Sequence, residues 1–157
     1  FTLELGKTIS EDVESVFMSF NLNRTGSDTV LRRWSEAFRP GVDQLPGSCM
    51  EFYMSDDGVA SVDAQNSVLI AARDVPLVYM GSMNHHPIKL CDKNAENNAR
   101  PLYSWIMNNN WETNFKMDLS GFCQYDYSLW LSDITMPDAA MDELHEQLFD
   151  PYVLIIG

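Results

Sequence analysis

The side chains best suited to chemistry lie in residues 105–115, where amides surround a tryptophan. The asparagines around Trp111 are Asn108, Asn109, Asn110 and Asn114. A primary amide offers N–H donors and a carbonyl acceptor, which suits paired hydroxyl groups, and an indole face gives an apolar C–H surface something to stack on. This combination is typical of sugar binding. The alternative interpretation is that these asparagines are turn residues and Trp111 belongs to the core.

A second candidate pair, Asp43 and Gln44, precedes the turn-forming residues 45–47, Leu-Pro-Gly. Pro46 and Gly47 suit the two central positions of a type II turn. Such a turn would hold the carboxylate and the amide rigidly. Both groups can bind hydroxyls. The alternative interpretation is that Asp43 caps the turn by accepting a hydrogen bond from a nearby backbone N–H.

Other patterns give little support to catalysis or metal binding. His85 and His86 are adjacent, so on a strand they would point to opposite faces and could not hold one ion together. A glycosidase needs two carboxyl groups roughly 5 to 9 Å apart, and the sequence marks no such pair as buried. Nucleophile-elbow, P-loop and dinucleotide-binding motifs are absent. We therefore predict no catalytic residue and no metal ligand.

Composition narrows the classes of partner. The 157 residues are enough for one domain with a hydrophobic core, and 45% of them are hydrophobic. The formal net charge of -13 repels phosphate groups, which disfavours nucleic acids and anionic membrane surfaces. The same charge is compatible with a neutral ligand such as a sugar. No apolar run approaches the roughly 20 residues that a membrane span needs.

The cysteines indicate the cellular compartment, and the two ends of the sequence indicate the domain organisation. Cys49, Cys91 and Cys123 are odd in number and lack metal-binding spacing, so we expect unpaired thiols and a cytoplasmic protein. The sequence starts at Phe1 and stops in an apolar, strand-like run at 153–157. We expect residues 1–157 to be a single domain taken from a longer chain.

Short strand-like runs separated by turn residues dominate the sequence and predict an antiparallel β-sandwich. Residues 29–38 fit a helix or a strand by their apolar spacing, and extended structure is the interpretation that we follow. Asp56-Asp57-Gly58 is typical of a hairpin turn leading into the strand at 59–62.

One C-terminal helix is predicted to begin at Pro137 and to end before Asp150-Pro151. Its apolar face carries Met141, Leu144 and Leu148, and His145 lies on the opposite, polar side.

Residues 102–115, Leu-Tyr-Ser-Trp-Ile-Met-Asn-Asn-Asn-Trp-Glu-Thr-Asn-Phe, resemble a signature in glycoside hydrolase family 38, the α-mannosidases. The signature, Asn-Asn-x-Trp-x-Thr-Asn-Phe, belongs to the C-terminal β region of that family. Further stretches resemble the same region in the same order: 14–20, 43–48 (Asp-Gln-Leu-Pro-Gly-Ser), 74–78 (Asp-Val-Pro-Leu-Val) and 121–129. The Asn/Trp motif is the most specific of these. Residues 81–100 have no clear family equivalent.

The resemblance implies a mainly β fold of the supersandwich type and a non-catalytic role. Family 38 enzymes are zinc-dependent retaining α-mannosidases whose zinc ligands and catalytic carboxylates lie in a separate N-terminal domain. This chain would pack on that catalytic domain, would need no cofactor itself, and would contact mannose-type glycans. The candidate sugar contacts are Asp43, Gln44, Asn108, Asn109, Trp111 and Asn114. The alternatives are a stand-alone carbohydrate-binding module and a purely structural sandwich domain.

Overall fold

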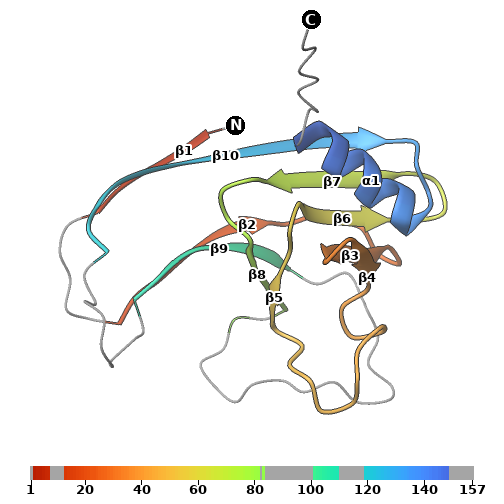
Figure 1. Cartoon of the computed structure of the whole chain (residues 1–157), viewed down its shortest axis with the longest axis horizontal. Coiled ribbons are helices and arrows are strands. Elements are labelled where there is room, and N and C mark those ends of the chain that lie inside the picture. The colour runs from red at the N-terminus through yellow and green to blue at the C-terminus, as the bar shows by residue number, and fades with distance from the viewer. Residues whose placement is uncertain (1, 8–12, 82, 84–100, 110–118, 149–157) are drawn as a thin grey trace, which may run out of the picture.

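Alternating apolar and polar residues produce strands that assemble into two antiparallel sheets (Figure 1). The computed structural model describes residues 2–7, 13–81, 83, 101–109 and 119–148. The strands are β1 (Thr2–Lys7), β2 (Ser15–Phe20), β3 (Asp28–Arg33), β4 (Glu36–Phe38), β5 (Phe52–Met54), β6 (Gly58–Val62), β7 (Ser67–Ala72), β8 (Leu77–Met80), β9 (Leu102–Asn108) and β10 (Gly121–Ser132). One helix follows, α1 (Pro137–Leu148). The predicted mainly β sandwich with one C-terminal helix is confirmed.

The larger sheet has six strands in the order β1-β10-β7-β6-β3-β4, and the smaller has four in the order β2-β9-β8-β5. The long strand β10 pairs with β1 through its first half and with β7 through its second half. Strands β5 and β6 are neighbours in sequence but belong to different sheets. The predicted hairpin turn at 56–58 is therefore wrong: this segment carries the chain from one sheet to the other.

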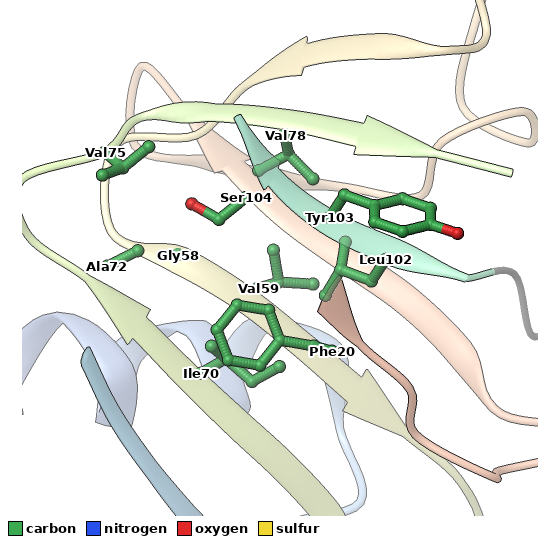
Figure 2. A pocket seen from close by; sticks show the side chains of 10 residues that line it. All are labelled: Phe20, Gly58, Val59, Ile70, Ala72, Val75, Val78, Leu102, Tyr103 and Ser104. Atoms are coloured by element: carbon green, nitrogen blue, oxygen red, sulfur yellow. The ribbon is translucent and has the colours of Figure 1, made fainter. Parts of the chain in front are cut away.

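The main core lies between the two sheets and is built from the inward-facing side chains of both. Figure 2 shows part of this interior, where Phe20, Val59, Ile70 and Leu102 surround a gap of about 10 Å³. That volume is close to the smallest that holds one water molecule. The gap is therefore a minor packing void and offers no room for a ligand.

A second core joins the six-stranded sheet to the helix. The predicted apolar face of α1 is confirmed, because Met141, Leu144 and Leu148 are all buried. The helix packs on β6, β7, β3 and β4, and Figure 1 shows it lying across that sheet. Strands β6 and β7 are consequently covered on both faces, which explains why they are apolar or small at nearly every position.

Residues 29–38 are extended, as we expected, and form the β3–β4 hairpin. Apolar spacing there also fits a helix, but pairing with β6 on one side and the turn at Trp34 and Ser35 select strands. In the described part of the chain, no helix is long and apolar enough to cross a membrane.

Candidate functional site

Asp43 lies in the loop after β4, where Arg39 binds it. The guanidinium donates from Nε to Oδ2 and from Nη2 to Oδ1, each at 2.9 Å, and the Arg39 backbone N–H also donates to Oδ2 at 2.9 Å. Hydrogen bonding from Arg39 holds the pKa of Asp43 below its usual range. The carboxylate is thus kept ionised, and it fixes this loop as the capping interpretation expects.

Gln44 is likewise engaged by the protein itself. Its Oε1 accepts hydrogen bonds from the Gly41 N–H at 2.6 Å and from the Tyr53 hydroxyl at 2.8 Å. Its Nε2 donates to the Cys49 carbonyl at 3.0 Å. These bonds tie the loop to β5, so a ligand would have to share or replace them.

Asn108 ends β9 beside the start of β2, and Asn109 is the next residue. Asn109 is only 2% exposed, accepts a hydrogen bond from the Glu14 N–H at Oδ1, and donates its own N–H to the Glu14 carbonyl at 3.1 Å. Asn108 is exposed, and Ser15 Oγ lies 3.5 Å from its Oδ1. Asn109 therefore extends the pairing of two strands, whereas Asn108 faces solvent.

The predicted sugar contacts do not form one cluster among the described residues. In Figure 1 the loop after β4 and the last residues of β9 lie far apart along the longest axis of the molecule. Trp111 and Asn114 lie outside the described residues, as do His85, His86 and Cys91. Within the described part, no group of three or more His, Cys, Asp or Glu side chains is placed to hold a metal ion.

One cavity brings Asp43 together with residues that we did not predict. It has a volume of about 180 Å³ and is lined by Val30, Ala37, Phe38, Arg39, Asp43, Pro137 and Asp138. It lies between the end of β4 and the first turn of α1. Typical small-molecule sites span roughly 300 to 1,000 Å³, so this cavity has room for one small polar molecule.

The outer face of the four-stranded sheet carries a cluster of rings that we call the aromatic face: Phe17, Phe52, Tyr79, Tyr103 and Trp105. Phe17 stacks on Trp105 with centroids 5.3 Å apart, and Phe52 contacts both Trp105 at 5.2 Å and Tyr79 at 5.1 Å. These residues alternate with the inward residues of the same strands, which places them away from the core. Phe52 is 38% exposed.

A network of charged side chains joins α1 to the six-stranded sheet. Asp57 is 1% exposed, and its Oδ1 lies 3.0 Å from Nδ1 of His145 on the helix. Nε of Arg32 lies 3.7 Å from the other carboxylate oxygen, and Arg32 also pairs with Asp142. His145 lies on the polar side of the helix as predicted and is 49% exposed, and nothing local in the sequence indicates that Asp57 is its partner.

Comparison with known proteins identifies no relative: no family model, curated protein or solved structure matches this chain.

Proposed function

We propose that this chain is the non-catalytic β domain of an α-mannosidase-like glycoside hydrolase and that it packs on the catalytic domain through the aromatic face. The observation that carries this proposal is the composition of the four-stranded sheet. Strands β2, β5, β8 and β9 contain no Asp, Glu, Lys or Arg, although charged residues make up 21% of the chain.

An outward sheet face normally carries polar side chains, because it meets water. Here most outward positions carry aromatic rings, although Ser19 is polar and Tyr79 is only 4% exposed. The exposed apolar surface at Phe52 continues at Leu77 and Met54, which are 39% and 43% exposed. Contiguous apolar surface of this kind marks protein–protein contact. Aromatic residues and low charge are characteristic of interface cores, which supports packing against another domain.

Asp43, Gln44 and Asn109 form their hydrogen bonds with other groups of this chain, which agrees with a non-catalytic role for the domain. The mannosidase assignment itself derives from the resemblance of residues 102–115 and of the ordered stretches around them to family 38. In the proposed enzyme, zinc and both catalytic carboxylates belong to the other domain. This chain alone should therefore leave aryl α-mannosides intact even with zinc added, and turnover above the blank would contradict the proposal.

The test begins with the natural gene upstream of Phe1. We expect it to encode several hundred residues that include a His-x-Asp zinc motif, and these residues, co-expressed as a separate segment, should co-purify with this chain. Phe52→Asp combined with Leu77→Asp should abolish co-purification and leave the circular dichroism spectrum unchanged. Leu45→Asp is the matched control, because Leu45 is 81% exposed and lies off this face. An upstream sequence without such a domain, or a complex that survives both substitutions, would refute the proposal.

A second candidate function is a stand-alone carbohydrate-binding module, which the cavity beside Asp43 favours. A guanidinium and two carboxylates, from Arg39, Asp43 and Asp138, line it, and such groups bind sugar hydroxyls well. Mannose oligosaccharides should then bind with heat that isothermal titration calorimetry measures, and Asp138→Ala should weaken that binding. Absence of binding at millimolar sugar would exclude this alternative.

A further inference from the structure

The tip of the β3–β4 hairpin holds two residues in an unfavourable backbone conformation. Trp34 and Ser35 have φ angles of 56° and 69°, and Arg33 pairs with Glu36 across the turn. A two-residue loop with both φ angles positive favours Asn-Gly, because most side chains clash in the left-handed region. The sequence places a tryptophan there instead, so the hairpin carries strain that a simple substitution would remove.

One carboxylate braces this tip. Asp56 accepts a hydrogen bond from the Trp34 N–H at 2.8 Å with one oxygen and from Nη1 of Arg33 at 2.9 Å with the other. The Arg33 guanidinium in turn lies 5.6 Å from the centre of the Trp34 ring, over its face. The indole is thus held by its own backbone and by a cation on one side.

The fold gains little from this arrangement, because Trp34 is 80% exposed. An indole that stays in water contributes almost nothing to hydrophobic stability. Backbone strain that persists without a packing benefit is a reason to look for function at that position. An exposed indole whose backbone is held in place in this way can bind a ligand against its free face.

We infer that Trp34 is a stacking platform for a saccharide ring, which would lie on the indole face opposite the Arg33 guanidinium. The neighbours of the indole on the hairpin are Arg33, Ser35 and Glu36, so the apolar surroundings that a protein interface needs are missing there. The net charge of -13 disfavours nucleobases carried on a phosphate backbone. A neutral ligand with a C–H face and ring hydroxyls fits both observations.

The hairpin tip lies on the six-stranded sheet and the aromatic face on the other, so the two surfaces can be tested separately. The choice of mannose as the probe sugar rests on the proposed function. The Trp34 platform also differs from the six sugar contacts predicted from sequence, none of which is in this hairpin.

The test is an NMR titration of the full chain with α-linked mannobiose, following the indole N–H signals of its 4 tryptophans. We expect the Trp34 signal, assigned with Trp34→Phe, to shift most. Trp34→Ala should weaken binding about tenfold or more with an unchanged Tm. The double substitution Trp34→Asn with Ser35→Gly should abolish binding yet raise Tm, because Asn-Gly suits the turn. That opposition between stability and binding is not expected of a structural tryptophan.

Leu45→Ala serves as the control, since it removes an equally exposed apolar side chain from another loop and should leave the affinity unchanged. A titration in which the Trp34 signal does not move, or a Trp34→Ala variant of wild-type affinity, would overturn the inference. Shifts confined to Trp111 would overturn it too and would assign sugar binding to the Asn/Trp motif. The packing function is tested separately, by whether substitution of Phe52 abolishes co-purification with the catalytic domain.

Discussion

At the scale of single residues, Asp57 is the most deeply buried charged residue among those that the structure describes. Its side chain is 1% exposed and lies between Arg32 on β3 and His145 on α1. A buried carboxylate is tolerated only when cations and donors compensate for its lost hydration. Asp57 is thus the shared partner through which Arg32 on the sheet and His145 on the helix are joined.

We predict that Asp57→Ala lowers the free energy of unfolding by about 3 kcal/mol, because it leaves Arg32, which is 11% exposed, without its buried partner. Urea denaturation at neutral pH measures this change. Asp142→Ala is the comparison, since Asp142 pairs with the same guanidinium but is 67% exposed, and should cost less than about 1 kcal/mol. Equal effects of the two substitutions would contradict this account.

The lowered pKa of Asp43 makes a second prediction at this scale. A carboxyl whose pKa is lower in the folded state contributes stability above its unfolded pKa of about 3.9 and loses it as the pH falls through the folded value. The Tm advantage of the wild type over Asp43→Asn should hold from neutral pH to about pH 5 and shrink at lower pH. Thermal unfolding across this range tests it, and an advantage that grows on acidification would refute it. Because both partners are 39% exposed, the effect should stay below about 1 kcal/mol.

At the scale of elements, the close approach of β6 to β7 depends on one glycine. Gly58 begins β6 with a φ of +142°, and an added Cβ would lie 2.1 Å from the Ile70 carbonyl oxygen. No rotation of a side chain can relieve that overlap, because the obstacle is backbone. The strand could accommodate a methyl group only by moving away from its neighbour.

Gly58→Ala should therefore destabilise the protein by more than about 3 kcal/mol, through steric overlap and an unfavourable φ together. Chemical denaturation gives the value, and soluble yield gives a first indication. Gly6→Ala on β1 is the matched control, since nothing lies within 4 Å of a Cβ there. A Gly58→Ala protein as stable as the control would show that the strand shifts at little cost.

Elements also show what the sequence can predict and what it cannot. Helix α1 follows from local periodicity, because the burial of one of its faces is recorded in residues close along the chain, whereas β7 is buried on both faces and shows no alternation. The hairpin predicted at Asp56 failed, because which sheet a strand joins depends on partners far away in sequence. The same limit applies at the candidate site, where the hydrogen bond between the Tyr53 hydroxyl and Gln44 becomes visible only in three dimensions.

At the scale of the whole molecule, one hydrogen bond crosses the interior between the two sheets. Ser104 Oγ on β9 lies 2.9 Å from the Tyr127 hydroxyl on β10, and both residues are buried. Burial also raises the pKa of Tyr127. Each hydroxyl gives the other a hydrogen-bond partner in an otherwise apolar core. The bond therefore links β9 in one sheet to β10 in the other.

We predict that Tyr127→Phe costs about 1 to 2 kcal/mol, because it leaves the Ser104 hydroxyl buried without this partner. Tyr127→Phe combined with Ser104→Ala should cost less than the sum of the two single changes, since no polar group is then stranded. A double-mutant cycle by urea denaturation measures the coupling. Strictly additive effects would show that the bond contributes nothing to the sandwich.

The pairing of β1 with β10 has a consequence for how the protein is made. Thr2 and Asp126, which bond across these strands, are 124 positions apart in the chain. A ribosome adds roughly 5 to 20 residues per second, so β1 waits for many seconds before its partner exists. During that interval its unpaired edge and apolar side chains are open to other nascent chains. Slowing translation should therefore lower the yield of native protein, and chaperones that shield nascent strands should restore it.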